Sequence, residues 1–196
     1  PHAHETQYNY AHVAYLISEL GVEPSGVVGG FIASPVNESK FDYLQNQIQG
    51  NMYDTSWTPE VLWGAATGGH GNESDLWVSG IWKPKDAENY TTDGGTLPAV
   101  GGYYTTWEGL DDLMAKDLDP TKIYTVGIFI GQRSLNEASI EQFQSKIEQY
   151  KTDERIEWVG LNELLEIWET EYGSESNILK YDGEVTGKSK ADKGRN

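Results

Sequence analysis

Apolar runs that alternate with amphipathic helical patterns are the feature of this sequence that most constrains its fold. Residues 26–33 (GVVGGFIA) form a continuous apolar run, which follows a segment, 8–20, whose apolar residues recur with helical spacing. A second apolar run, 122–131, is followed by the helical pattern of 135–151. Strands that are apolar along their whole length are typical of parallel sheets covered by helices on both faces. The order of these segments therefore predicts an α/β domain with a mostly parallel sheet.

The remaining periodic segments extend this pattern along the chain. Apolar spacing predicts short helices over 40–49 and 106–118, and a short apolar run predicts a strand over 156–160. We expect Asn162 to cap a last helix that continues to Tyr172. With these elements, the second half of the chain reads helix, strand, helix, strand, helix, which is the alternation of a parallel-sheet domain.

The end of the chain has a different composition. Residues 173–196 keep Tyr181 as their one aromatic residue and finish in a sequence rich in lysine and glycine. Such a composition is typical of a solvated segment. We therefore expect an α/β domain over residues 1–172 and a solvated C-terminal extension or linker over residues 173–196.

Residues 51–105 interrupt the alternation with a long stretch rich in glycine and aromatic residues. The whole chain holds seven tryptophans and twelve tyrosines, and this stretch includes Trp63, Trp82 and Tyr103. A long stretch of this kind is typical of a functional loop system or a set of short strands. Aromatic faces commonly line sugar-binding clefts, so these three residues are candidates for contact with a carbohydrate. The alternative is that they are ordinary core and surface aromatics.

Two histidines at the start of the chain form a candidate metal site. His2 and His4 point to the same face if the segment is extended, and Glu5 follows them directly. Two imidazoles and a nearby carboxylate suit a divalent ion, zinc above all, with an open position for water. His70 lies in a glycine-rich segment and completes a three-histidine site if the fold brings it to the first two. The alternative is that all three are surface histidines.

Charge and composition exclude several classes of function. The formal net charge of −17 argues against binding to nucleic acid or to an anionic membrane surface, because both need a basic patch. No run of 18 apolar residues is present, so we expect no membrane insertion. The chain has no cysteine, which excludes disulfides, thiolate metal ligands and a cysteine nucleophile.

Other short motifs, present or absent, indicate where the protein acts and which kinds of catalytic site it lacks. Asn37, Asn72 and Asn89 each begin an N-x-Ser/Thr sequence, which favours an extracellular glycoprotein. The chain lacks the glycine patterns of phosphate-binding loops and the G-x-S-x-G sequence of α/β-hydrolases. His12 falls on the side of the 8–20 helix away from its apolar stripe, and the acidic pair Asp111-Asp112 is expected to face solvent on the 106–118 helix.

Taken together, these residues resemble the polysaccharide-deacetylase (carbohydrate esterase) superfamily. The resemblance rests on the start Pro1-His2-Ala3-His4-Glu5, on the stretch from Trp63 through His70 to Ser79-Gly80-Ile81-Trp82-Lys83-Pro84, and on the ending, in which strand, helix, strand and helix follow one another from residue 122. It covers about residues 1–172. Here the histidines are two positions apart rather than the family's four, and Gln132 stands where the family often places a histidine.

The resemblance implies a distorted (β/α) barrel with a long aromatic and glycine-rich insertion. This chain resembles the C-terminal two-thirds of such a barrel, so the first strands, with the family's aspartate pair, are expected before Pro1. In the family, a divalent ion held by two histidines and an aspartate activates water that cleaves an acetamide on a sugar. Carried over here, His2 and His4 are the metal histidines.

Two functions follow as hypotheses. The first is a metal-dependent hydrolase that removes N- or O-acetyl groups from a polysaccharide. His2, His4 and His70 bind the ion, Glu5 orients a ligand or assists proton transfer, and the aromatic residues contact the sugar. The second is a non-catalytic extracellular protein that binds carbohydrate or serves in a structural assembly, with self-association as a possibility. Both place the chain outside the cell, secreted or at the cell surface.

Overall fold

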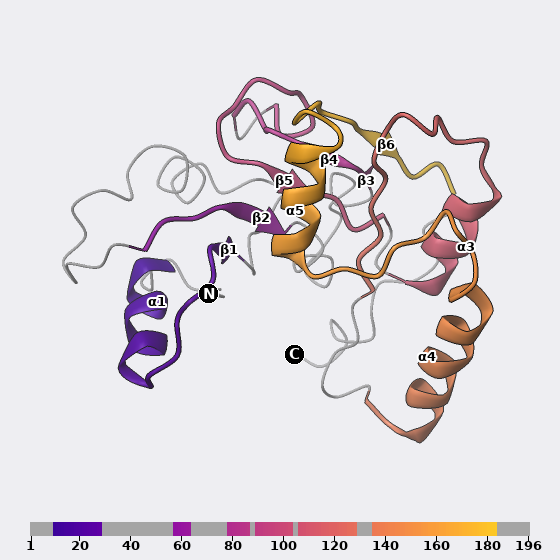
Figure 1. Ribbon diagram of the computed structural model, residues 1–196, viewed down its shortest axis with the longest axis horizontal. Coiled ribbons are helices and arrows are strands. Elements are labelled where there is room, and N and C mark those ends of the chain that lie inside the picture. Colours follow the sequence, from indigo (N-terminus) through magenta and orange to yellow (C-terminus); the bar gives the residue numbers. More distant parts are fainter. Residues whose placement is uncertain are drawn as a thin grey trace, which may run out of the picture.

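A computed structural model of the chain describes residues 10–28, 57–63, 78–86, 89–103, 106–128 and 135–183. Their centre is a four-stranded sheet in the order β1-β2-β5-β4 (Figure 1). The β1–β2 and β2–β5 pairs are parallel, and the β5–β4 pair is antiparallel. The strands are short: β1 is Val27–Val28, β2 is Val61–Trp63, β4 is Ile81–Trp82 and β5 is Ala99–Val100.

Four helices and one further strand pair complete the described part of the chain. The helices are α1 (Tyr10–Glu19), α3 (Trp107–Ala115), α4 (Glu137–Tyr150) and α5 (Leu161–Thr170). The second sheet pairs β3 (Val78–Ser79) with β6 (Leu179–Lys180) in antiparallel orientation. The expected α/β class with a parallel-rich sheet is confirmed.

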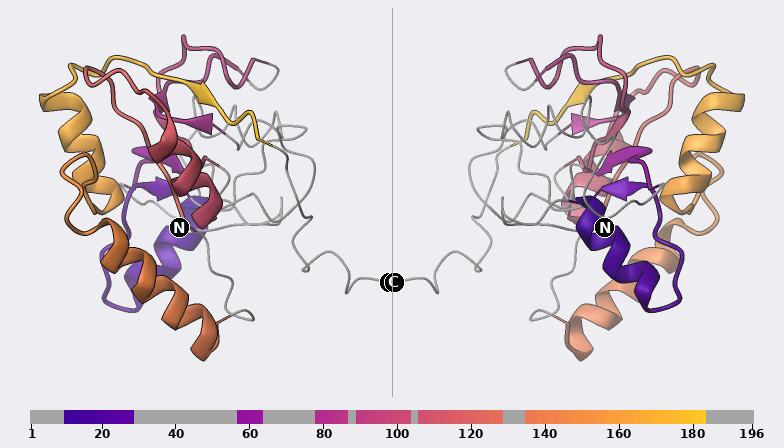
Figure 2. Two further views of the ribbon diagram at one scale, coloured as in Figure 1. Left: turned by 90° about the vertical axis from the view of Figure 1, so that its right-hand side faces the viewer. Right: turned by 90° about the vertical axis from the view of Figure 1, so that its left-hand side faces the viewer.

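Helices cover the central sheet on both faces, as its apolar strands predict. Alternate residues of each strand point to opposite faces. On one face, Leu62 and Ala99 join the buried residues of α1 in one core cluster. On the other, Val61 and Val100 join Trp168 of α5, and α5 stands on one side of the strands in Figure 2. The sheet is thus the middle layer of three.

A third cluster joins α3 to α4 away from the sheet. Trp107 and Leu110 of α3 pack with Tyr150, the last residue of α4. The start of α4 is held by a capping box, in which the Asn136 side chain accepts from the Ser139 N–H and the Ser139 hydroxyl accepts from the Asn136 N–H. The rest of α4 is largely exposed, so its stability depends on this cap and on the contacts of its C-terminal half with α3.

A buried polar junction links the two sheets. The Thr125 hydroxyl shares its one hydrogen between the carbonyls of Gly101 (2.8 Å) and Gly80 (3.1 Å), and it accepts from the Gly80 N–H (2.8 Å). The Thr125 N–H donates to Ser79 Oγ at 2.8 Å. At Gly101 a Cβ atom would lie 2.1 Å from the Val78 carbonyl oxygen, so only glycine fits the approach of β5 to β3.

This junction explains why one expected strand is not formed. The sequence predicts a strand over 122–131, but 122–128 make no ladder, and 129–131 lie outside the described residues. In this segment the Thr125 N–H donates to the Ser79 side chain, and the Gly127 N–H donates to the Gly102 carbonyl at 3.2 Å. Side-chain partners have replaced the regular pairing of a strand.

Three other expectations differ at their boundaries. Residues 156–160 form no strand, because Ile156 closes a turn onto the Asp153 carbonyl and most of the segment is exposed. The last helix begins after Gly160 rather than Asn162. Residues 173–183, assigned from composition to a solvated extension, contribute β6 to the second sheet.

The other predicted elements are confirmed where they are described. The helix expected over 8–20 is α1, that over 106–118 contains α3, and that over 135–151 contains α4. The strand expected over 26–33 begins as β1, and its remainder lies outside the described residues, as does the helix expected over 40–49.

Replacing Gly101 and Gly160 by serine tests the close approach at the junction. Gly101→Ser should lower the free energy of unfolding by about 2 kcal/mol, because the new Cβ meets backbone that cannot move aside. Gly160→Ser is the matched control, since nothing lies within 4 Å and serine is a favoured residue at this helix-capping position. Urea unfolding of both variants measures the difference, and equal stabilities would contradict the packing described here.

Candidate functional site

The carboxyl edge of the parallel strands is the place in this fold where a site is expected. In open α/β sheets, ligands bind beyond the carboxyl ends of parallel strands. Trp63 ends β2 and lies in register with Val100, which ends β5. The chain therefore leaves two neighbouring strands at one edge, and it leaves β1 there too, after Val28. Trp63 is partly exposed at this edge.

Tyr103 follows the carboxyl end of β5, but its side chain is buried. Its backbone has a positive φ of 41°, which is uncommon for a residue other than glycine. The hydroxyl donates to Asp112 Oδ2 at 2.7 Å, and the Tyr181 ring stacks edge-on at 5.3 Å. Burial, followed by the hydrogen bond to Asp112, raises the pKa of Tyr103 far above its ordinary value. The hydroxyl therefore stays protonated and holds the chain after β5 against α3.

Lys116 connects this tyrosine–aspartate pair to the C-terminal segment. Its Nζ lies 2.8 Å from Asp182 Oδ1 and 3.5 Å from Asp112 Oδ2. The hydrogen bond to Asp182 raises the pKa of Lys116, and the same bond lowers the pKa of Asp182. Both groups are solvent-accessible, so the pair is screened by water and contributes little stability by itself. It places residues 179–183 beside Tyr103.

The acidic pair of α3 takes part in hydrogen-bond networks rather than facing solvent alone. Lys146 donates to both oxygens of Asp111, at 2.8 and 2.7 Å, and the Tyr150 hydroxyl donates to the same carboxylate. Burial raises the pKa of Asp111, but the bonds from Lys146 and Tyr150 outweigh it and leave the pKa below its ordinary value. Burial and the bond to Asp111 raise the pKa of Tyr150 to about 12. These contacts hold α4 to α3.

Trp82 lies in the interior of the molecule. Only 1% of its surface is exposed, its indole N–H donates to the Tyr90 carbonyl at 2.6 Å, and the two rings meet edge-on at 5.7 Å. Because β4 runs antiparallel to β5, the chain beyond Trp82 proceeds away from the carboxyl edge. Of the three aromatic candidates, Trp63 alone is accessible at that edge, while Trp82 and Tyr103 pack the structure beneath it.

The metal candidates His2, His4 and His70, and the candidate acid or base Glu5, lie outside the described residues. Within the described ranges, no group of three histidine, aspartate or glutamate side chains is arranged to hold a metal ion. His12 lies on α1 and is partly buried. Across the same ranges, no helix is both long enough and apolar enough to cross a membrane.

Comparisons with known proteins do not assign this chain to a family. No family model matches it, and neither a curated protein nor a solved structure gives a significant match.

Replacing Asp111 by asparagine tests the α3–α4 network. The variant should lose about 1 kcal/mol of stability near neutral pH, a value reduced for the partial exposure of this carboxylate. The folded pKa lies below the unfolded one, so this contribution is present above about pH 4 and disappears as the pH falls through the folded pKa.

Urea unfolding at about pH 7 and about pH 3 measures this difference. Asp117→Asn, at an exposed position just after α3, removes the same charge as a control and should change stability little at either pH. A loss for Asp111→Asn that is equally large at both pH values would contradict the ionic character of the network.

Proposed function

We propose that this chain is a metal-dependent hydrolase that removes acetyl groups from a polysaccharide outside the cell. One observation carries the proposal: three parallel strands end at one edge, and Trp63 is accessible there. His70 follows Trp63 by seven residues in the sequence and lies outside the described residues. Parallel α/β sheets bind ligands at this edge, which favours a catalytic site over a purely structural role.

The donor set fits a divalent ion of the zinc type. Three imidazoles, from His2, His4 and His70, with an open position are a ligand set of catalytic zinc sites. The ion would supply an activated water and would stabilise the oxyanion that develops on the acetyl carbonyl. Glu5 would assist the proton transfer from that water to the leaving group. We further propose that the parallel strands belong to a distorted (β/α) barrel of the polysaccharide-deacetylase type, which places these groups at its carboxyl mouth.

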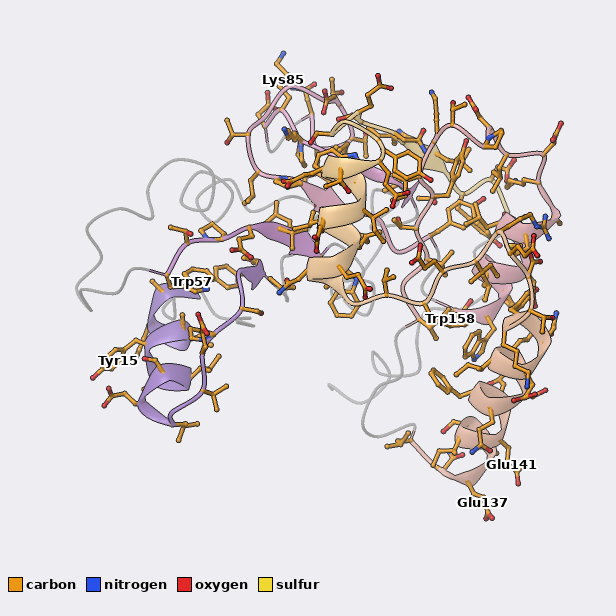
Figure 3. All side chains as sticks on the ribbon, in the orientation of Figure 1. Tyr15, Trp57, Lys85, Glu137, Glu141 and Trp158 are labelled. Carbon is orange, nitrogen blue, oxygen red and sulfur yellow. The ribbon has the colours of Figure 1, made fainter. Side chains whose placement is uncertain are left out.

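A specific observation favours a second function, that of a non-catalytic component of an extracellular assembly. Large apolar side chains are exposed on and near α4: Leu135 by 58%, Ile140 by 46%, Phe143 by 36% and Trp158 by 47%. Figure 3 shows Glu137 and Glu141 at the end of α4 farthest from the sheet. An exposed helix that carries both apolar and acidic residues suits contact with another protein.

Acetate release from an N-acetylated glucosamine hexasaccharide tests the hydrolase directly. The zinc-loaded protein should release acetate, a chelator should abolish the release, and added zinc should restore it. His2→Ala and His4→Ala should lower the rate by at least about 100-fold, the upper end of the loss seen when a partner of a metal ligand is removed. His12→Ala is the control and should retain the rate.

The same experiment separates the two functions. Binding of the hexasaccharide that persists in both histidine variants, with no acetate released by any zinc-loaded form, would contradict the hydrolase and favour the non-catalytic protein.

Substitution of single tryptophans tests where the sugar binds. Trp63→Ala should weaken hexasaccharide binding about 5- to 10-fold, the loss expected for one aromatic contact. Trp158→Ala removes an equally large and more exposed ring, and it should leave the affinity unchanged. Isothermal titration with folding checked by circular dichroism measures both, and the reverse order of effects would place the sugar elsewhere.

A further inference from the structure

A tight turn on the periphery of the molecule carries the Asn89-Tyr90-Thr91 sequence. The Thr92 N–H donates to the Asn89 carbonyl at 3.0 Å, which closes the turn, and the Lys85 N–H donates to the Thr92 carbonyl at 2.8 Å. A bridge between Pro84 and Asp93 fixes the base. Figure 3 shows Lys85 at the outer edge of the molecule, so the turn projects away from the sheet.

The middle residue of the sequence anchors the turn. Tyr90 is buried, with only 2% of its surface exposed, and its ring packs against Trp82. Its carbonyl accepts the 2.6 Å hydrogen bond from the Trp82 indole. Asn89 on one side is exposed, and Thr91 on the other is partly exposed. An N-glycosylation sequence specifies the asparagine and the threonine but allows almost any residue between them. The fold buries this middle residue, Tyr90, and leaves Asn89 and Thr91 at the surface.

The side-chain amide of Asn89 is held in a way that tolerates substitution. Its Nδ2 atom donates to Asp86 Oδ1 at 2.8 Å, and the backbone N–H of Asn89 donates to the same oxygen at 2.7 Å. A side-chain amide carries two N–H bonds. Replacing one of them by a bond to a sugar leaves the other for Asp86, so the turn keeps its geometry when the glycan points to solvent.

We propose that Asn89 is an N-glycosylation site of this protein. The proposal rests on the extracellular location proposed above but does not depend on the metal-dependent reaction. In the transfer, Nδ2 forms a bond to the anomeric carbon of an oligosaccharide carried on a polyprenyl pyrophosphate. The bond from that carbon to the phosphate oxygen breaks, the lipid pyrophosphate leaves, and the displaced amide proton passes to a base of the membrane transferase.

Secretion of the chain from yeast behind a cleavable leader tests the proposal. Peptide mapping by mass spectrometry should find a glycan on the peptide that contains Asn89, and an N-glycosidase should release it and convert that asparagine to aspartate. Asn37 and Asn72 begin similar sequences outside the described residues, so the assignment is made on the Asn89 peptide alone.

Two substitutions at one position provide the matched control. Thr91→Val keeps the size of the side chain and should abolish the modification at Asn89, whereas Thr91→Ser should retain it. Asn162→Gln removes an exposed asparagine outside any such sequence and should change nothing. An unmodified Asn89 in the secreted, folded wild-type chain would overturn the proposal. Acetate release is measured on the unglycosylated protein produced in bacteria. The hydrolase proposal and the glycosylation proposal are therefore tested on different samples, and either can fail without the other.

Discussion

The hydroxyl group of Thr125 is the point on which the described structure most depends. It bonds to the backbone at Gly80 and Gly101, and the Thr125 N–H bonds to Ser79. These bonds join the central sheet to the smaller one and fix the chain as it leaves β5. A buried polar group left without a partner costs about 1–3 kcal/mol, so separating Thr125 from Ser79, Gly80 and Gly101 would destabilise the fold. The carboxyl edge with Trp63 is positioned by this junction.

The carboxyl edge is also anchored from the side of the helices. Tyr103 bonds to Asp112 of α3, and the Tyr181 ring covers it. Buried anchors of this kind hold an edge still while the residues above them remain free to contact a ligand. Tyr103 supports this edge from within the structure, and Trp63 is the partly exposed aromatic residue at the edge, which we propose contacts a sugar.

The regular elements could be predicted from the sequence because their periodicity is local. The apolar spacing of 135–151 corresponds to α4, and the unbroken apolar run at 26–33 indicated a sheet covered on both faces. The apolar run at 122–131 looked equally strand-like, but the partners of Thr125 lie 24 to 46 residues away along the chain. Long-range side-chain bonds of this kind leave no periodic signal. The composition of 173–183 likewise gave no sign of β6.

The burial of Trp82 and Tyr103 could not be predicted from the sequence either, because it depends on contacts that leave no local pattern. Aromatic residues in a glycine-rich stretch suit a cleft and a core equally well, and only the packing of Trp82 against Tyr90 distinguishes the two. The pair Asp111-Asp112 was expected to face solvent. Its hydrogen-bond partners could not be foreseen, because Lys146 comes from another helix and Tyr103 from the segment after β5. One signal was present in the sequence: Lys146 and Tyr150 are four residues apart, which places both on one helix face toward a common partner.

X-ray absorption spectroscopy at the zinc edge of the zinc-loaded protein shows which atoms surround the ion. We expect nitrogen ligands at about 2.0–2.1 Å with the scattering pattern of imidazole rings, and the loss of that pattern in a His2→Ala/His4→Ala variant. A zinc ion surrounded only by water or carboxylate oxygens, with a spectrum unchanged in that variant, would contradict it.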